Sequence, residues 1–233
     1  MSTSPTIVLV HGAFADASSW AATYAELKSD GLPIVAPPVP LRGVLSDAAY
    51  LTSVLDQIDG DVVLVGHSYG GAVITVAGGH DKVRALVYVA AYALDEGESL
   101  GQLQGSFPDS ALAAALRFAP LPDGGTDVSV DPEKFPDVFA ADVPREQTEF
   151  LAIAQRPLAA SAFEELAPTA AWKSKPSYGL VPTADTTINP EVHRFGFARA
   201  GMTVVEVEGA SHAVALSQPK AVAELVRTAI AAL

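Results

Sequence analysis

One serine in this sequence stands where it could serve as an activated nucleophile. Ser68 lies between two glycines in the run GHSYG at residues 66–70, which has the form G-x-S-x-G. A serine hydroxyl attacks an acyl carbon poorly unless a base removes its proton, a third group orients that base, and preorganised donors bind the developing oxyanion. A site for acyl transfer therefore also needs a histidine, a carboxylate and two amide donors close to Ser68.

The base that we predict is His212, one of five histidines. It ends the run EGASH at residues 208–212, in a loop between the last predicted strand and the last predicted helix. That position lies at the carboxyl edge of a parallel sheet, where ligands bind in open α/β folds. His11 and His67 stand inside the two turn motifs, so we expect them to pack or to form local hydrogen bonds. His80 and His193 fall on helix or helix-end positions, where we expect surface or helix-end partners.

Two aspartates compete for the part of the orienting acid. Asp185 follows the predicted strand at residues 178–181 and gives the chain order Ser, Asp, His that is expected after a G-x-S-x-G turn. Asp95 lies four residues after Ala91, where an earlier predicted strand ends, and some hydrolases reach the acid from that neighbouring strand. Because Asp95 opens the acidic run DEGE, which is typical of a solvated loop, we favour Asp185 and keep Asp95 as the alternative.

Two backbone amides are candidates for an oxyanion hole. In a serine site of this form, one donor is the N–H of the residue after the nucleophile, which is Tyr69 here. The other comes from the loop after the first strand, which reads HGAF at residues 11–14. Gly12 lets the chain turn sharply at the end of that strand, so we expect the amide of Ala13 to point toward Ser68.

The elements that must position these residues follow from the alternation of short β-branched runs with longer helical patterns, which is typical of α/β proteins with a parallel sheet. The sequence predicts about six mostly parallel strands, at residues 6–10, 33–36, 61–65, 83–89, 178–181 and 202–207. Flanking helices are predicted at residues 18–29, 46–57 with Ser46 as a cap, 70–79, 190–200 and 219–232. Ser68 then stands in a turn between a strand and a helix, as a G-x-S-x-G nucleophile requires.

The alternation stops between residues 93 and 175, where the sequence shows no clear strand. Helical patterns occur there at residues 110–118, 145–155 and 160–166, together with a stretch rich in proline, glycine and aspartate. A segment of this length without strands indicates an inserted subdomain rather than a structureless loop. We therefore expect an α/β core formed by residues 1–92 and 176–233, with a helical lid formed by residues 93–175.

Composition limits the partners of the chain. The 233 residues are 49% hydrophobic, which is enough for one domain with a thick buried sheet. Lysine and arginine total 14 against 27 acidic residues, and the net charge of −13 would repel nucleic acids and anionic membranes, so neither is expected as a partner. The chain has no cysteine, and its apolar runs are shorter than the roughly 20 residues of a membrane span, so we expect a cytoplasmic protein. A homodimer is compatible with this composition.

Four runs of the sequence resemble small esterases of the α/β-hydrolase superfamily that group with plant methylesterases and hydroxynitrile lyases: VLVHGAFADASSW, VVLVGHSYGGAVI, LVYVAAYALDEGES and VVEVEGASHAVALSQP. The resemblance extends along the chain apart from the insertion. It implies an α/β-hydrolase fold in which Ser68, Asp185 and His212 form a catalytic triad and the amides of Ala13 and Tyr69 form the oxyanion hole. It also implies that the segment after residue 92 is a lid.

This group contains both ester hydrolases and lyases that split cyanohydrins. Lyases that resemble this chain carry a threonine at the position of Gly12 and a lysine at the position of Ala213. Without a cation beside the histidine, no evident group would stabilise a departing cyanide. The sequence therefore favours a carboxylesterase that forms an acyl-enzyme on Ser68, and a hydroxynitrile lyase or a non-catalytic small-molecule receptor are the alternatives.

The expected substrate is a small, neutral and apolar ester. No arginine pair in the sequence marks a clamp for a carboxylate or a phosphate. The leucine and phenylalanine residues of the insertion would suit an apolar pocket, and they would equally suit packing of the insertion on the core. The expected chemistry requires no metal or organic cofactor. An alkyl ester, an aryl ester, a lactone and a thioester all remain open as substrates.

Overall fold

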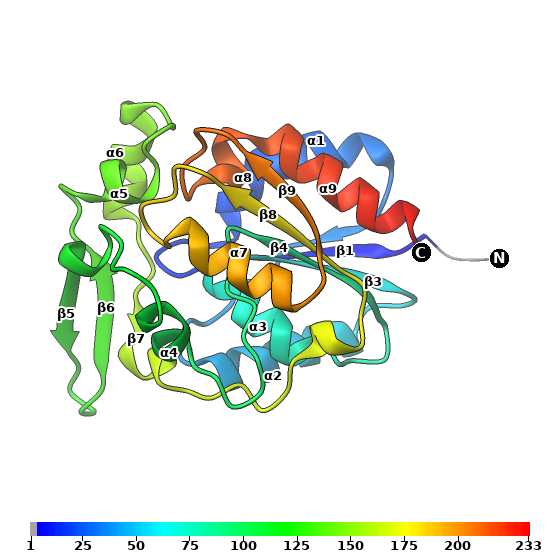
Figure 1. The fold of residues 1–233 in the computed structure, drawn as a ribbon, viewed down its shortest axis with the longest axis horizontal. Coiled ribbons are helices and arrows are strands. Elements are labelled where there is room, and N and C mark those ends of the chain that lie inside the picture. Colours follow the sequence, from blue (N-terminus) through cyan, green and yellow to red (C-terminus); the bar gives the residue numbers. More distant parts are fainter. Residues whose placement is uncertain (1–3) are drawn as a thin grey trace.

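A parallel sheet of six strands runs through the centre of the structure, a computed structural model that describes residues 4–233 (Figure 1). The strand order is β2-β1-β3-β4-β8-β9. The strands are β1 (Thr6–Val10), β2 (Ile34–Val35), β3 (Val62–His67), β4 (Val83–Val89), β8 (Ser177–Pro182) and β9 (Thr203–Val207). Every neighbouring pair is parallel, so the six predicted strands are confirmed.

Helices cover both faces of the sheet, which explains why its inner strands are apolar on both sides. Successive side chains of a strand point to opposite faces, so Ile7 and Leu9 of β1 join one apolar layer while Val8 and Val10 join the other. The first layer includes α1 (Ala21–Leu27), α8 (Val214–Ser217) and α9 (Pro219–Ala231). The second includes α2 (Val44–Asp56), α3 (Tyr69–Ala77) and α7 (Pro190–Arg199), and Figure 1 shows α9 and α2 on opposite sides of the sheet.

The boundaries of two helices matter for the site. Helix α7 begins with Pro190 after Asn189, whose side chain accepts a hydrogen bond from the Glu191 amide at 3.0 Å. Helix α2 begins two residues before the predicted cap Ser46, which is therefore wrong as a cap. Gly43 is the N-cap, and the Ser46 hydroxyl donates instead to the Gly43 carbonyl at 3.1 Å, inside the first turn.

The insertion contains strands that the sequence pattern did not predict. They are β5 (Leu116–Pro120), β6 (Thr126–Val130) and β7 (Leu158–Ala159), which form a separate antiparallel sheet. The helix expected at 110–118 is wrong, because only a short 3-10 turn forms at Ala113–Ala115 before β5 begins. The run of alanines there imitates a helix, while β5 is only five residues long and almost entirely exposed, so it gives a weak strand signal. The helix expected at 145–155 is present as α6 (Arg145–Ile153), whereas the one expected at 160–166 is only a 3-10 turn at Ala160–Phe163. The helices α4 (Leu100–Gly105) and α5 (Phe135–Phe139) were not predicted.

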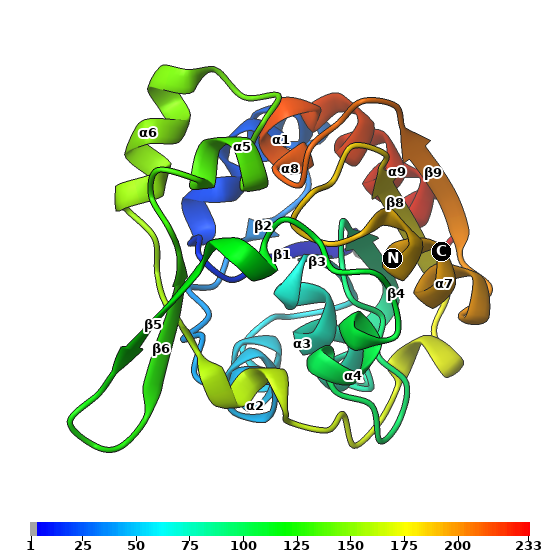
Figure 2. The same cartoon turned by 60° about the vertical axis from the view of Figure 1, so that its left-hand side comes forward.

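The insertion lies over the carboxyl ends of the parallel strands. In Figure 2 the green segments α4, α5, α6 and the β5–β6 hairpin surround this edge of the sheet, and the hairpin projects away from the core. The loops that follow β1, β3, β8 and β9 meet at the same edge, and they carry the residues expected to act together. Within residues 4–233, no helix has the length and apolar character that crossing a bilayer requires.

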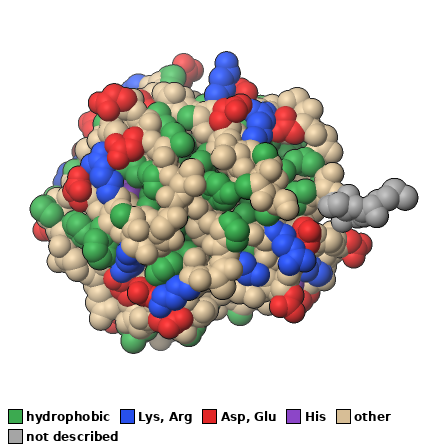
Figure 3. Space-filling model, turned by 45° about the vertical axis from the view of Figure 1, so that its right-hand side comes forward, with side chains coloured by type: hydrophobic (Ala, Val, Ile, Leu, Met, Phe, Trp, Pro, Cys, Tyr) green, Lys and Arg blue, Asp and Glu red, His purple; other side chains and the backbone are tan. Residues whose placement is uncertain are grey.

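Charged side chains on the surface occur largely as mixed pairs. On the face drawn in Figure 3, lysine and arginine side chains lie beside aspartate and glutamate side chains. Arg194 is an example, with ion pairs to Glu206 at 2.7 Å and to Glu191 at 2.6 Å. Arg227 bonds Asp30 at 2.8 Å in the same way. Local acidic partners thus neutralise these cations.

Candidate active site

Ser68 sits on a strained turn between β3 and α3. Its backbone has φ 55° and ψ −122°, a left-handed conformation that is costly for a residue with a side chain. The turn is tight because a Cβ on Gly66 would lie 2.6 Å from the Gly70 carbonyl oxygen, and a Cβ on Gly70 would lie 2.5 Å from the Val10 carbonyl oxygen. The two glycines of the G-x-S-x-G run are therefore required by packing, and the serine is held at the carboxyl edge of the sheet.

Asp185 and His212 meet below the insertion, although 27 positions separate them in the chain. Asp185 Oδ2 lies 2.7 Å from His212 Nδ1, and both side chains are fully buried. Burial alone would raise the pKa of the Asp185 carboxyl, but its attraction to His212 and its hydrogen bonds with two histidines hold the pKa well below its usual range. Asp185 is therefore ionised and can orient the His212 ring with a proton on Nδ1.

Asp95, the alternative candidate for the orienting acid, does not contact His212. The Asp95 carboxylate is at the surface and forms an ion pair with Lys173 Nζ at 2.6 Å. That hydrogen bond lowers the pKa of the Asp95 carboxyl below its usual range. The structure brings Asp185, and not Asp95, to His212.

The second nitrogen of His212 is free to act as a base. Nε2 is buried and has no hydrogen-bond partner within residues 4–233, so its bond to the Ser68 hydroxyl is not formed. Such bonds are often loose before a substrate binds. His67 fixes the backbone of the same loop, because its Nε2 lies 2.9 Å from the His212 carbonyl oxygen. Burial lowers the pKa of His67 to about 3, so the ring is neutral and donates this bond through Nε2–H.

The two predicted oxyanion donors border the same small cavity as the serine. This cavity is about 20 Å³, and Ala13, Ser68 and Tyr69 all line it. Neither the Ala13 amide nor the Tyr69 amide makes a hydrogen bond within the described part of the chain. A space of this size holds about one water-sized group, so it suits an oxygen atom better than a whole ester.

The side chain of Tyr69 makes a hydrogen bond that was not predicted from the sequence. Its hydroxyl donates to Asp47 Oδ2 at 2.7 Å, across the contact between α3 and α2. Burial raises the pKa of both the Tyr69 hydroxyl and the Asp47 carboxyl. This bond ties the first turn of α3 in place, and with it the amide that follows Ser68.

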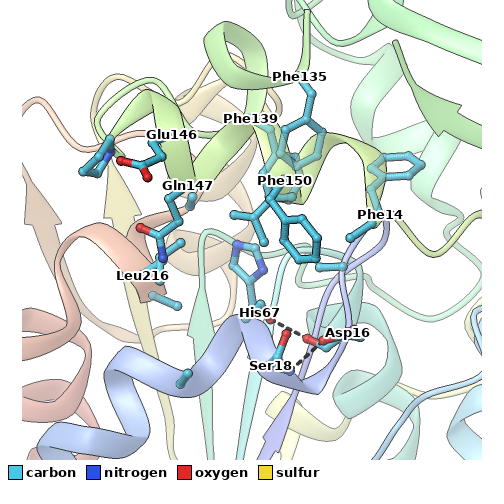
Figure 4. Close-up of a pocket in the computed structure, with 18 residues that line it drawn as sticks. Phe14, Asp16, Ser18, His67, Phe135, Phe139, Glu146, Gln147, Phe150 and Leu216 are labelled. Carbon is cyan, nitrogen blue, oxygen red and sulfur yellow. Dashed lines mark hydrogen bonds between the residues drawn. The ribbon is translucent and has the colours of Figure 1, made fainter. Parts of the chain in front are cut away.

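A much larger cavity lies beside Ser68, which does not line it. Its volume is about 710 Å³, and its walls come from the loop after β1, from α5 and α6, and from α8. In Figure 4, Phe135 and Phe139 lie in the upper part of the view, His67 and Phe150 lie near its centre, and Asp16 lies below His67. Phe14 lines both cavities, and its backbone has a positive φ of 62°. Phe14 therefore borders both spaces.

The insertion is tied directly to the loop that carries His212. The Ala213 amide donates to the Phe139 carbonyl at 3.0 Å, and the Ser211 hydroxyl donates to Asp142. The Phe139 ring also meets the His212 ring edge to face, with centroids 4.9 Å apart. Movement of this part of the insertion would therefore displace the loop that carries His212.

His193 was expected to be a surface or helix-end residue. It does lie in the first turn of α7, but the surface position is wrong. The side chain is completely buried on α7, and its Nε2 lies 3.1 Å from Asp185 Oδ2. A signal was present in the sequence, because His193 stands one turn into the helix that begins just after the Asp185 loop. His11 bonds locally, as predicted, with Nδ1 2.9 Å from the Gly12 carbonyl, and His80 bonds Asp56. The local bond expected for His67 is wrong, because its partner is the carbonyl of His212, 145 positions along the chain.

The fold and this edge define a class of protein: a parallel α/β sheet with a serine at a strand-to-helix turn and an aspartate–histidine pair on the loops after later strands. The sequence pattern described as the alpha/beta hydrolase family matches residues 7–225, and the chain belongs to this family. The predicted fold class is confirmed.

Two curated relatives match part of the chain. A carbendazim hydrolyzing esterase of Nocardioides sp. is 37% identical over 107 residues, which cover 40% of this chain and 44% of the relative. A probable hydrolase R7 of Phoma sp. is 34% identical over 119 residues, which cover 44% of this chain and 49% of the relative. The matches thus span about half the length of these relatives.

Solved structures share the fold over nearly the whole chain. A pyrethroid hydrolase from Sphingobium faniae JZ-2 has a TM-score of 0.81 at 23% identity and covers 99% of this chain and 98% of its own. Polyneuridine aldehyde esterase has a TM-score of 0.84 at 22% identity, with 97% and 99% covered. A methylesterase from Arabidopsis has a TM-score of 0.82 at 18% identity, with 98% and 100% covered. The resemblance to the methylesterase-like group is confirmed at the level of fold.

Proposed function

We propose that the chain is a serine esterase that cleaves carboxylic esters through an acyl-enzyme on Ser68. The observation that carries the proposal is the buried 2.7 Å bond between Asp185 and His212 Nδ1, which leaves Nε2 of the same ring free. The names of similar proteins support the reaction class, since they include a carbendazim hydrolyzing esterase, a pyrethroid hydrolase and polyneuridine aldehyde esterase.

In the proposed first step, His212 Nε2 takes the proton of the Ser68 hydroxyl as that oxygen attacks the ester carbonyl. Asp185 keeps the proton of the resting ring on Nδ1, and its negative charge stabilises the imidazolium that forms. When the tetrahedral intermediate collapses, the ester C–O bond breaks and the proton on Nε2 passes to the leaving alcohol. Water then attacks the acyl-enzyme by the same route, which releases the acid and restores Ser68.

The oxyanion of each tetrahedral intermediate would lie in the 20 Å³ cavity. The amides of Ala13 and Tyr69 border this space and have no other acceptor within residues 4–233, so they are available as donors. Removal of a single donor of this kind typically slows catalysis by about 10² to 10³. The Asp47–Tyr69 bond supports the proposed site by fixing the turn that presents one of these amides.

The substrate that fits best is a neutral ester with one bulky apolar group. The small cavity at Ser68 cannot hold such a group, whereas the adjoining 710 Å³ cavity is lined mainly by apolar side chains. We place the larger group of the ester there, which requires the Phe14 side chain to move aside. The acidic side chains at this cavity, Asp16 and Glu146, would disfavour an anionic substrate.

Cyanohydrin cleavage is disfavoured by the space around Gly12. A Cβ at this position would lie 2.9 Å from Ser68 Cβ and 3.1 Å from His67 Nδ1, so a threonine would crowd the nucleophile. Ala213, which follows the base, supplies no positive charge. Both features support ester hydrolysis over the lyase reaction.

A fluorophosphonate probe followed by peptide mapping tests the proposal. The probe should label Ser68 in the native protein and should fail to label the Ser68→Ala variant. Ser53→Ala is the matched control, because Ser53 is an exposed serine on α2 and its loss should leave labelling unchanged. Absence of labelling at Ser68 would contradict the proposal and would favour a receptor that binds small molecules without turnover.

A further inference from the structure

The Asp185 carboxylate has all of its acceptor positions filled. Oδ1 accepts hydrogen bonds from the amides of Thr187 at 2.8 Å and Ile188 at 2.9 Å. Oδ2 lies 2.7 Å from His212 Nδ1 and 3.1 Å from His193 Nε2. A carboxylate offers about four lone-pair positions, so four donors leave no place for a proton on the carboxyl itself. The nitrogen of His193 that faces Asp185 must therefore carry a proton.

The other ring nitrogen of His193 faces a second acceptor. Nδ1 lies 3.2 Å from the carbonyl oxygen of Ala91, just after β4. A neutral imidazole has a single N–H, so it would leave a buried lone pair against an oxygen atom, which is unfavourable. An imidazolium donates to both acceptors. The His193 ring also stacks on Phe197 with centroids 6.0 Å apart and an interplanar angle of 23°, where an aromatic face favours a cation.

We infer that His193 is a positioning residue that acts as a buried imidazolium. It holds the Asp185 carboxylate in place beside the end of β4, and it gives this carboxylate a positively charged partner. His193 lines neither of the two described cavities, so it acts through Asp185 rather than on the substrate. The role in catalysis rests on the proposed function, because Asp185 needs positioning only if His212 works as a base. The protonation state of His193 does not rest on it.

The charges around His193 decide how this residue affects the pH dependence. Asp185 faces it from the loop after β8, and His212 lies on the far side of Asp185. His67 on β3 and Tyr92 after β4 lie near these groups, and both are neutral. Burial lowers the pKa of His67 to about 3 and raises the pKa of Tyr92. Asp185 and His193 therefore carry the charges beside the resting His212 ring, which becomes charged only when it takes a proton.

Three further charged groups stand on the same helix as His193. Glu191 and Arg194 pair with each other at 2.6 Å, and Arg199 pairs with Glu98, so each of these cations has an acidic partner. With His193 positive, Asp185 is partly neutralised and attracts a proton to His212 less strongly. Loss of the positive charge at His193 should make protonation of His212 easier. The acidic limb of the kcat/KM profile should then move to higher pH.

The protonation state can be measured without any turnover. Protein labelled with ¹⁵N-histidine gives ring ¹⁵N–¹H correlations, and the signals missing from the His193→Gln variant belong to His193. At about pH 7.5, where an unperturbed histidine is neutral, both ring nitrogens of His193 should carry protons. A single protonated nitrogen at that pH would overturn the inference, whatever the outcome of the labelling of Ser68.

Two variants separate charge from packing in the kinetics. His193→Gln keeps one donor without charge, and it should move the acidic limb of kcat/KM up by about one pH unit. His193→Phe removes the donor as well, and it should lower kcat by a further 10- to 100-fold or so with little change in KM. His80→Gln, at a histidine that bonds Asp56 far from the site, is the control and should change neither quantity.

The outcomes distinguish this inference from the proposed function. An unshifted acidic limb in His193→Gln, with the wild-type enzyme active, would overturn the positioning role. If the wild type hydrolyses no ester and Ser68 is not labelled, the proposed function fails and the kinetic role fails with it. The NMR measurement would still decide whether His193 is an imidazolium. Circular dichroism of each variant shows whether a kinetic loss comes from unfolding.

Discussion

Asp185 Oδ2 lies 2.7 Å from His212 Nδ1, and neither side chain is accessible to solvent. The two residues come from loops after neighbouring parallel strands, β8 and β9, which run in register from Tyr178 opposite Thr203 to Pro182 opposite Val207. Because parallel strands end at the same edge, the register of these two strands places the aspartate and the histidine together. The bond is thus a consequence of sheet topology, and it is the natural first target for substitution.

Replacing this aspartate should nearly abolish activity. Asp185→Asn keeps the shape of the side chain but cannot impose a proton on His212 Nδ1, so kcat should fall by about 10⁴. Asp95→Asn is the matched control, because Asp95 pairs with Lys173 at the surface and should change kcat less than about twofold. Steady-state kinetics with a chromogenic ester measure both. A larger loss in Asp95→Asn than in Asp185→Asn would show that the acid has been wrongly assigned.

Gly12 should tolerate no side chain, for reasons of space. In Gly12→Ala the new Cβ would lie 2.9 Å from Ser68 Cβ, so the nucleophile or the loop must shift. We expect a destabilisation of about 1–3 kcal/mol and a fall in kcat/KM of about 10- to 100-fold. Gly79→Ala is the control, because a Cβ there meets nothing within 4 Å. Urea unfolding and ester kinetics should separate the two variants, and an unimpaired Gly12→Ala enzyme would speak against the proposed geometry.

Much of the core could be predicted from the sequence, because local patterns determine it. The β-branched runs gave all six parallel strands, and Ser68 was located by the strand, turn and helix around it. The hairpin of β5 and β6 was missed because both strands are only five residues long and the outer one, β5, is almost entirely exposed. The burial of His193 was missed because its partners, Asp185 and the Ala91 carbonyl, lie on other elements, and helical spacing alone does not reveal such contacts.

The two cavities could not be predicted from the sequence, for a related reason. The leucine and phenylalanine residues of the insertion indicated apolar surface, but not which of them pack and which face open space. Phe135, for example, stacks on Phe139 at 4.7 Å and also lines the large cavity. Side-chain direction depends on how the insertion docks on the core, which is a tertiary property.

His67 should make the stability of the protein depend on pH. Burial lowers its pKa to about 3, whereas the unfolded chain binds a proton near the ordinary value of about 6.5. Between these values the unfolded state binds more protons than the native state, so stability falls as the pH is lowered. One proton corresponds to a slope of about 1.4 kcal/mol per pH unit.

Urea unfolding at several pH values from about 6.5 down to 4 measures this slope. In His67→Gln the slope should decrease by about that amount, because the titrating group is gone while Gln can still donate to the His212 carbonyl. His80→Gln serves as the control, since His80 lies on a surface pair with Asp56 and should leave the slope nearly unchanged. Equal slopes for the wild type and His67→Gln would show that His67 titrates normally in the folded protein.

Phe14 should govern which esters reach Ser68. Phe14 lines both the 20 Å³ cavity at Ser68 and the 710 Å³ cavity next to it, and only 4% of the residue is exposed. In Phe14→Leu the smaller side chain leaves more space there, so kcat/KM for an ester with a long acyl chain should rise relative to that for an acetate. We expect the ratio to change by about 10-fold, the scale of one or two methylene groups in an apolar pocket.

The matched control is Phe118→Leu, because Phe118 lies on the exposed strand β5 and lines neither cavity. A series of p-nitrophenyl esters of increasing chain length gives the ratio for each variant. The positive φ of Phe14 is kept by leucine at a similar cost, so the change in the ratio reports the side chain rather than the backbone. If Phe14→Leu leaves the ratio as it is in the wild type, the substrate does not pass Phe14, and the large cavity is not where its bulky group binds.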